Sequence, residues 1–483
     1  MPGMFGVIGC IPSCWDTLLK EFSTIWGEVE ACKVDTGAVG GHAFGGAKAV
    51  YKLVEGPVFA IDGEASLYSR AGSQAAGVSA PIFHIGPDGL VLSEDCAGNV
   101  AVLDPISGSL SLGAAVSGSF PLYYAQVRRG LLFSSLLRPL TKAMACIAKI
   151  EPDMVGVIQK LRRGSHFFGN RTFVSGVCRL LPGQVLCFRP DIGQVTIKET
   201  SDFGAGGYDN RTQGLNNAAD ICWEVLLAAV KRSVGGGRTA LMMSGGWDSR
   251  VLLAAYRAVL GIDNVLCYGH GDPASRELRI ARDICEKTGV RFRLESMEEA
   301  IDPSTFDSVF ARTESLISPE WQHAGRVLAG MGIKGVSAGV YGAVLGGQQG
   351  FDYLERGYRK IPVVLNELAS RALRKDGHSI RDFEALKSAF SVRELGKPWY
   401  MLQDAWEAVP SVQESINADL DRDFRRLKAR NIIHQDQLLE VFLVETRQSQ
   451  YEIDQMLSCR AFVNISIPYG DHGLLRLAGS IPW

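Results

Sequence analysis

Residues 238–260 read RTALMMSGGWDSRVLLAAYRAVL, and this stretch decides the fold of the second half of the chain. Residues 238–243 have the composition of a buried strand, and the residues from 251 onward have that of an apolar helix. Farther on, strands predicted at 264–268 and 290–294 enclose a helix predicted over 274–288. Strands and helices in alternation predict an α/β domain with a parallel sheet.

The loop between the first strand and its helix, residues 244–249, suits an anion such as phosphate. Its glycines let the backbone approach a ligand closely, and its N–H groups and the helix N-terminus favour negative charge. Ser244 and Ser249 add hydroxyl donors for phosphate oxygens. Asp248 is expected to hold Mg²⁺, which bridges carboxylate and phosphate. The alternative is a plain strand–helix turn, which the complete strand–loop–helix context disfavours.

The first 200 residues show a different pattern. Short apolar runs lie between Gly- and Pro-rich turns, with few long helical patterns, and they predict a mostly antiparallel sheet domain. A Gly-rich segment at 202–207 is a plausible linker. We therefore predict domain one over 1–205 and domain two over 206–483, the latter ending in a mainly helical part whose longest helix covers 435–459.

Composition and charge narrow the classes of partner and the cellular location that we expect for the protein. The 483 residues carry a formal net charge of −2, which supplies no whole-chain field for nucleic acid or an anionic membrane. The 11 cysteines form no CxxC pair, which suits a reducing cytoplasm. The uncharged run 105–127 is too rich in Ser and Gly to span a membrane, and no signal peptide is visible. We expect a soluble, cytoplasmic protein.

The motifs together resemble a known family. Ser244–Ser249 resembles the pyrophosphate loop of the ATP-pyrophosphatase class, and the chain as a whole resembles the asparagine synthetase B family. Supporting segments follow the family's order along the chain: residues 1–7, 62–64, 120–124, 177–183, 454–456 and 467–471. The resemblance implies an α+β N-terminal-nucleophile-like sandwich followed by an α/β, adenine nucleotide α-hydrolase-like domain with a helical C-terminal part.

The family resemblance also implies a chemistry. Such a domain two adenylates a carboxylate with ATP and Mg²⁺, and an amine or ammonia then displaces AMP and leaves an amide. Asp248 and Glu277 are the implied catalytic residues, and Asp248 is the implied metal ligand. For Glu277 an ordinary position on a helix surface is an equal alternative. The implied nucleotide-binding residues are Met243, Ser244, Gly245, Gly246, Asp248, Ser249, Tyr268, Ser337 and Gly339.

Domain one departs from the family pattern. The family's glutaminase uses a Cys exposed after Met removal, and Pro2 stands at that position here. Cys10 and Cys14 lie too far along to present an α-amine. Asp62 replaces an Asn of the oxyanion hole, and a carboxylate repels a developing oxyanion. We predict that domain one does not hydrolyse glutamine and is a structural or partner-binding relic.

Domain two departs as well. In a second Gly-rich loop, 337–347, Gly342 and Ala343 stand where the family has acidic residues. Asp352 or Glu355 is an alternative metal ligand, although a solvated surface position is favoured for both. A late catalytic Lys of the family has no counterpart before Trp483, which means either a truncated sequence or a missing lysine.

Other side chains carry weaker alternatives. His270 either contacts the nucleotide or is a loop histidine without a chemical role, and the second is favoured. Arg250 is placed to reach a phosphate or a nearby carboxylate. A basic cluster is expected to be a solvated helix face, the alternative being a docking site for an acidic partner or leader peptide; it comprises Arg422, Arg425, Arg426, Lys428 and Arg430.

The sequence thus predicts an ATP-dependent amide-forming ligase that works without glutamine hydrolysis on a small-molecule or peptide carboxylate. Family members without the Cys include β-lactam and carbapenam synthetases and lasso-peptide macrolactam cyclases, which use an amine already in the substrate. The alternatives are a nucleotide-binding scaffold or regulator and a glutamine-hydrolysing asparagine synthetase. No nucleic acid or membrane partner is expected, and a partner protein or homodimer stays open.

Overall fold

The computed structural model describes residues 3–8, 12–26, 30–35, 41–46, 50–52, 58–63, 83–86, 89–92, 96–104, 106–128, 130–163, 167–205, 215–234, 238–296, 303–313, 320–346, 412–432 and 435–481. The predicted boundary at 205/206 adjoins residues 206–214, outside these ranges, and stays a prediction. No helix among the described residues combines the length and apolar character that a membrane crossing requires.

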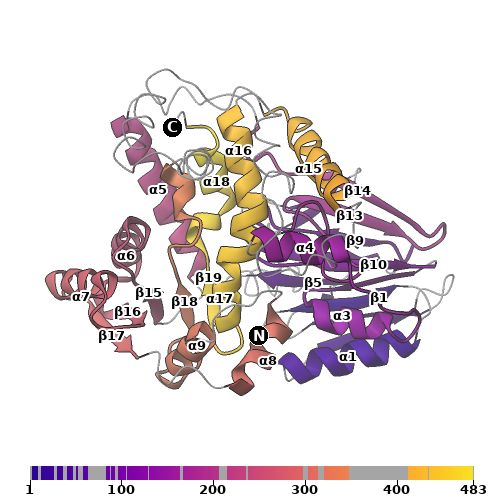
Figure 1. Ribbon diagram of the computed structural model, residues 1–483, viewed down its shortest axis with the longest axis horizontal. Helices are drawn as coiled ribbons and strands as arrows, with labels where there is room; N and C mark the ends of the chain where they lie inside the picture. Colours follow the sequence, from indigo (N-terminus) through magenta and orange to yellow (C-terminus); the bar gives the residue numbers. More distant parts are fainter. Residues whose placement is uncertain are drawn as a thin grey trace.

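In the described part of domain one the strands form two six-stranded sheets. Their antiparallel pairing agrees with the prediction, and the strands lie together at the right of Figure 1. The first has the order β12 (Cys178–Arg179), β10 (Tyr123–Val127), β11 (Gly130–Ser134), β1 (Met4–Ile8), β3 (Gly41–Gly46), β2 (Glu30–Asp35). The second has the order β14 (Gln194–Glu199), β13 (Gln184–Arg189), β9 (Leu110–Gly113), β8 (Gly98–Leu103), β5 (Val58–Gly63), β4 (Val50–Lys52). A separate hairpin pairs β6 (Phe83–Gly86) with β7 (Gly89–Leu92).

Alternation along β1 explains how the sheets pack. Met4 and Ile8 belong to the core that also holds side chains of the second sheet, whereas Phe5 and Val7 face the helices. Successive side chains of a strand point to opposite faces, so a strand buried on both faces is apolar throughout. That is why residues 4–8 contain no polar side chain.

Helices in the described part of domain one correct the expectation of few helical patterns. They are α1 (Pro12–Trp26), α3 (Leu137–Met144) and α4 (Met154–Arg163). In α1 the buried residues Trp15, Leu18 and Phe22 recur at helical spacing and pack with Phe5. This stripe was present in the sequence, but it is short and lies beside Gly- and Pro-rich segments.

Domain two is built on a five-stranded parallel sheet, as predicted. Its order is β17 (Arg291–Glu295), β16 (Val265–His270), β15 (Thr239–Met242), β18 (Gly335–Ser337), β19 (Asn464–Ser466). From β15 the chain adds β16 and β17 on one side and then crosses to β18 on the other. The carboxyl ends of β15 and β18 therefore flank a topological switch point, where α/β sheets bind ligands.

Helices surround this sheet and fill the space next to domain one (Figure 1). Among the described residues these helices are α5 (Leu215–Ser233), α6 (Trp247–Leu260), α7 (Arg276–Thr288), α8 (Pro303–Arg312), α9 (Glu320–Gly330), α15 (Val412–Lys428), α16 (Gln435–Leu443), α17 (Ile453–Cys459) and α18 (His472–Ala478). The helix predicted over 435–459 is continuous, but its middle, Val444–Glu452, is a π-helix.

Candidate functional site

The loop 243–246 lies at the switch point of the parallel sheet. Met243 N donates to the carbonyl of Tyr268 at 2.8 Å, which ties the loop to β16. Gly245 lies against α7, where an added Cβ would be 3.1 Å from the backbone oxygen of Glu277. A Cβ at this position would be in tight contact with α7, which would have to shift by a few tenths of an ångström, so the close approach favours glycine.

Two serines hold the loop in a closed turn. Ser249 Oγ lies 2.9 Å from the carbonyl oxygen of Ser244 and 3.1 Å from that of Gly246, and it donates to them. Ser244 Oγ accepts from Gly246 N at 3.2 Å. The hydroxyl of Ser249 is thus used inside the loop in this state, and its expected role as a phosphate donor stays a prediction.

Helix α6 begins at Trp247, four residues before the predicted start, so Asp248 and Ser249 lie in its first turn. Gly246 is the N-cap and has no side chain to cap the helix. The first-turn N–H groups have no intrahelical acceptor, so they are donors for an anion. Together with the partial positive charge of the helix end, this arrangement fits a phosphate group.

Asp248 points toward the second Gly-rich loop. An added Cβ at Gly342 would lie 2.5 Å from Asp248 Cγ and 2.9 Å from its Oδ2, and one at Gly339 would lie 3.0 Å from Asp248 Cβ. Although the residue as a whole is exposed, loss of water around its carboxyl raises the pKa of Asp248. The residues of the second loop therefore leave room for the carboxylate and bring no second acid.

Whether this site fits Mg²⁺ depends on Asp248. Among the described residues, no group of three His, Cys, Asp or Glu side chains is placed to hold a metal ion. Mg²⁺ is commonly held by one or two carboxylates together with substrate phosphates and water. A single carboxylate beside an uncapped helix N-terminus fits that mode and does not fit an all-protein metal cage.

Two buried hydroxyls lie at the carboxyl edge of the sheet. The Tyr268 hydroxyl on β16 and Ser337 Oγ on β18 have no hydrogen-bond partner among the described residues, and both side chains are fully buried. Burial raises the pKa of Tyr268. Buried polar groups normally have partners, so these two mark the edge where the resemblance predicts nucleotide contacts.

Three further residues singled out from the sequence, Glu277, His270 and Arg250, have a less clear relation to the candidate site. Glu277 is exposed in the first turn of α7. His270 ends β16 rather than lying in a loop; its ring is 5.3 Å from that of Trp321, and burial lowers its pKa. Arg250 donates to the carbonyl of Gly246 and stacks 3.7 Å from the Trp247 ring centroid, and its expected contact with a phosphate or carboxylate stays a prediction.

Two tyrosines near Asp248 were not predicted. Tyr469 donates its hydroxyl to the backbone oxygen of Asp248 at 2.9 Å, and burial raises its pKa. Tyr341 precedes Gly342, is fully buried, and has a φ of 70°, unusual for a residue other than glycine. Both lie in segments that the resemblance singled out, but only packing reveals their contacts.

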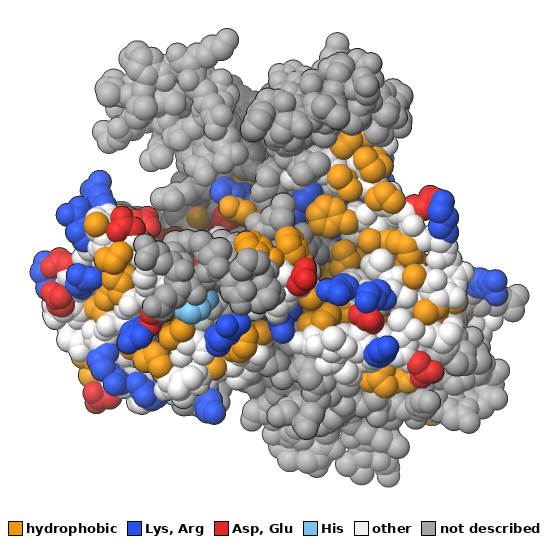
Figure 2. Space-filling model, turned by 60° about the horizontal axis from the view of Figure 1, so that its bottom comes forward, with side chains coloured by type: hydrophobic (Ala, Val, Ile, Leu, Met, Phe, Trp, Pro, Cys, Tyr) orange, Lys and Arg blue, Asp and Glu red, His pale blue; other side chains and the backbone are white. Residues whose placement is uncertain are grey.

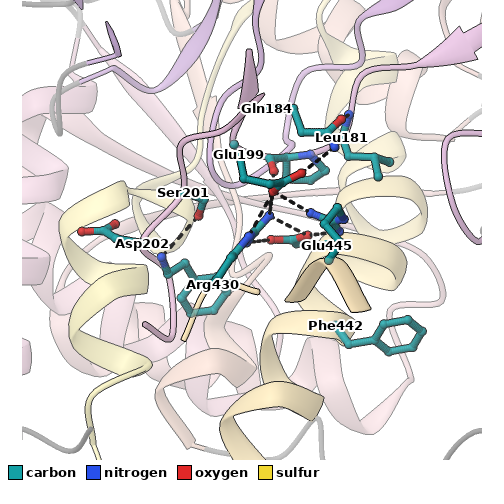
Figure 3. Close-up of polar contacts among 12 residues, drawn as sticks. Leu181, Gln184, Glu199, Ser201, Asp202, Arg430, Phe442 and Glu445 are labelled. Atoms are coloured by element: carbon teal, nitrogen blue, oxygen red, sulfur yellow. Dashed lines mark hydrogen bonds and ion pairs between the residues drawn. The ribbon is translucent and has the colours of Figure 1, made fainter. Parts of the chain in front are cut away.

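Two of the five residues of the basic cluster do not lie on a solvated face, contrary to the expectation from sequence. Arg422, Arg425 and Lys428 are exposed as expected, but Arg430 is buried and Arg426 half-buried. Arg430 pairs with Glu199 of domain one at 2.7 Å and with Glu445 of the π-helix, and Arg426 pairs with both carboxylates (Figure 3). These charges join the two domains, since their partners, distant in sequence, meet on folding.

Charges on the outer surface are mixed in sign. On the face drawn in Figure 2, the described Lys and Arg side chains are interspersed with Asp and Glu.

A cavity of about 320 Å³ opens between α3 and the end of α8, with Arg138 and Arg312 among its lining residues. Its lining includes no residue of the loops around Asp248, so it is separate from the candidate site.

Several sequence expectations concern residues outside the described ranges: Pro2, Cys10, Asp352, Glu355 and Trp483. Asp62 ends up within β5, and its side chain is likewise outside the description. Cys14 is a buried core cysteine of α1.

Sequence comparison supports the resemblance. No protein-family model matches the chain. The chain is 22% identical over 287 residues to a probable glutamine-hydrolysing asparagine synthetase of Acanthamoeba polyphaga mimivirus, a match covering 56% of this chain and 48% of that protein. The chain thus spans about half the length of that relative. It shows weak homology to an asparagine synthetase and fits an asparagine synthetase-like family.

Similar solved structures include an enzyme of purine biosynthesis, an amidotransferase and a synthetase. They are an allosteric regulatory enzyme of purine biosynthesis (TM-score 0.27, 9% identity, covering 61% of this chain and 80% of that one), a glutamine phosphoribosylpyrophosphate amidotransferase from B. subtilis complexed with ADP and GMP (0.25, 12%, 60% and 65%), and a glutamine-dependent NAD+ synthetase from Acinetobacter baumannii in complex with ADP (0.20, 16%, 59% and 62%). At these TM-scores the likenesses carry no argument about this chain.

Proposed function

We propose that the chain is an ATP-dependent amide-forming ligase that adenylates a substrate carboxylate. The observation that carries this proposal is the Ser-Gly-Gly-Trp-Asp-Ser loop, placed at the switch point of a parallel sheet and at the uncapped N-terminus of α6. The low-identity match to an asparagine synthetase supports the same class.

The reaction has two steps. A carboxylate oxygen of the substrate attacks the α-phosphorus of ATP, and pyrophosphate leaves. An amine then attacks the acyl carbon of the acyl adenylate, AMP leaves with its oxygen, and the amine loses a proton. Because the leaving groups are good ones, the protein's main task is to hold the reactants in register.

The residues of the loop suit that task. Gly245 and Gly246 leave the backbone open to the pyrophosphate portion, and the first-turn N–H groups of α6 donate to its oxygens. Asp248 would hold Mg²⁺, which when bound offsets the phosphate charge. Tyr268 and Ser337 present their buried hydroxyls at the same edge, on the side proposed for AMP.

The amine is proposed to come from ammonia or from the substrate itself. No cysteine occurs in β1, the first strand, and Asp62 stands in place of an oxyanion-hole Asn. A peptide macrolactam cyclase, in which carboxylate and amine belong to one peptide, is the finer form of this proposal. Incubation with glutamine tests it directly: ammonia release would favour the glutamine-hydrolysing asparagine synthetase instead.

A second candidate function is a nucleotide-binding scaffold without turnover. Gly342 and Ala343 favour it, because a metal held by one carboxylate is held less tightly. Calorimetry with ATP and Mg²⁺ followed by a pyrophosphate-release assay separates the two functions. Binding with pyrophosphate release supports the ligase, binding without release on any candidate carboxylate supports the scaffold, and failure to bind ATP removes both.

A further inference from the structure

A loop of domain one, residues 114–120, reaches the second Gly-rich loop of domain two. All seven residues of this loop, called the buttress loop below, are buried. Asn99, fully buried on β8, fixes its two ends: its side-chain amide donates to Phe120 O at 2.8 Å and accepts from Ala115 N at 3.0 Å. A loop held at both ends by one buried amide is a defined surface rather than a loose connection.

Tyr341 connects the buttress loop to the loop that faces Asp248. Its hydroxyl donates to Ser117 O at 2.7 Å across the domain boundary. Its backbone has a φ of 70°, a conformation that L side chains rarely adopt and that persists only where surrounding contacts impose it. The contact with Ser117 and the full burial of the ring supply that constraint.

The next residue along the chain is Gly342, which lies against Asp248. Its position is set by the turn at Tyr341, and Gly342 N closes that turn by donating to Gly339 O at 3.0 Å. Because a Cβ at Gly342 would lie 2.5 Å from Asp248 Cγ, the loop backbone forms one wall around the carboxylate. A displacement of Tyr341 moves that wall.

A second set of contacts links the buttress loop to Asp248. Gly470 lies against the buttress loop, where an added Cβ would be 3.3 Å from Ser117 Cβ and from Ser119 Oγ. The residue before it, Tyr469, donates to the backbone oxygen of Asp248. Two segments of domain two that touch the buttress loop therefore also touch Asp248.

We propose that domain one is a working part of the synthetase site: its buttress loop, acting through Tyr341, positions the Asp248 carboxylate. The role of Asp248 as metal ligand rests on the function proposed above, whereas the positional coupling does not. Domain one thus contributes to domain two even without glutaminase chemistry, and Tyr341 is a positioning residue, not a catalytic one.

Tyr341→Phe tests the coupling, because it keeps the ring and removes only the hydroxyl that bonds to Ser117. Calorimetry on the full chain with ATP, once with Mg²⁺ and once with EDTA, gives the metal-dependent part of binding. We expect about fivefold weaker binding with Mg²⁺, the effect of one lost hydrogen bond, and unchanged binding with EDTA. Equal binding to wild type under both conditions would overturn the proposal.

Tyr256→Phe is the matched control. Tyr256 is also fully buried and lies on α6 itself, but its hydroxyl bonds to Ser466 within domain two at 2.9 Å. We expect its Mg²⁺-dependent binding to stay within twofold of wild type. If both variants weaken binding alike, loosening of the core explains the effect and the positioning role is wrong.

Hydrogen exchange without nucleotide tests the coupling independently of the proposed function. Tyr341→Phe, and Asn99→Ala acting from domain one, are expected to speed exchange at 338–345 and 247–250, and Tyr256→Phe is not expected to speed it at 338–345. If the chain binds no ATP, the proposed function fails but this measurement still decides the coupling. Unchanged exchange at 338–345 in a folded Tyr341→Phe protein would overturn it.

Discussion

The Asp248 carboxylate lies against the backbone of Gly342, so close that a Cβ at residue 342 would be 2.5 Å from Asp248 Cγ. The family that the sequence resembles is expected to have an acidic residue at this position, so the resemblance alone would suggest the loss of one proposed metal ligand. The structure adds that the space for its Cβ is closed by the remaining carboxylate. The candidate site therefore holds one carboxylate, that of Asp248, and the backbone of Gly342 lies directly against it.

Gly342→Ala is expected to displace Asp248 and weaken Mg²⁺-dependent ATP binding at least tenfold, as measured by calorimetry. Gly330→Ala is the control, because an added Cβ there meets nothing within 4 Å. Gly342→Asp is expected to be impaired in the same way, since its Cβ meets the same obstacle. Tighter Mg²⁺-dependent binding in Gly342→Asp would contradict a site built around one carboxylate.

The pH dependence of metal-assisted binding follows from the Asp248 carboxyl. Desolvation raises its pKa, and only the ionised form binds a cation. As the pH falls, Mg²⁺-dependent ATP binding should therefore be lost at a higher pH than for a carboxyl of ordinary pKa. Titration calorimetry between pH 4 and 8 checks this, with Asp248→Asn as a reference that lacks the Mg²⁺ effect at every pH. A wild-type profile identical to that of Asp248→Asn would remove Asp248 as the metal ligand.

Arg430 is expected to be essential to the contact between the domains. Arg430→Met leaves Glu445, whose side chain is 1% exposed, without one of its two arginine partners. Breaking a buried ion pair from one side costs about 3–5 kcal/mol of unfolding free energy, which urea denaturation measures. Arg425→Met, an exposed change on the neighbouring helix α15, should stay within about 0.5 kcal/mol of wild type. Equal stability of the two variants would mean that the buried network contributes nothing.

The buried carboxyl of Asp423 should lower the unfolding free energy of the protein as the pH rises. It is buried, its Oδ2 accepts from Gly169 N at 2.7 Å, and burial raises its pKa to about 6. A raised carboxyl pKa contributes stability at low pH that is lost as the pH rises through about 6. Asp423→Asn, which keeps the acceptor and cannot ionise, should gain on wild type by up to about 3 kcal/mol between pH 4 and 7. A stability difference that does not change with pH would contradict this assignment.

The parts of the fold predicted correctly from sequence are those with local signals. The strand Thr239–Met242, the loop after it and helix α6 follow each other along the chain, and each has its own composition. The alternation in domain two likewise predicts the parallel sheet. Helix α1 was missed because its stripe, Trp15, Leu18 and Phe22, is only two turns long.

Contacts between residues distant in sequence were not predicted. Its charge and its place in a basic run favour a surface position for Arg430, and only folding brings Glu199 to it from 231 positions away. Tyr341 shows no sign in the sequence of a contact with Ser117, because that contact depends on how two domains pack. The place of Asp248 between a strand and a helix has a local signal and could be predicted, whereas the contacts that Tyr341 and Tyr469 make depend on tertiary packing.

Pyrophosphate release tests whether the chain adenylates a carboxylate. Wild type and Asp248→Asn are incubated with ATP, Mg²⁺ and a panel of small-molecule and peptide carboxylates, in samples shown by calorimetry to be folded and to bind ATP. We expect carboxylate-dependent pyrophosphate release by wild type and at least a hundredfold slower release by Asp248→Asn, about 3 kcal/mol of barrier. Carboxylate-dependent release that is equal in the two proteins, or ATP binding with no release on any carboxylate, would contradict it.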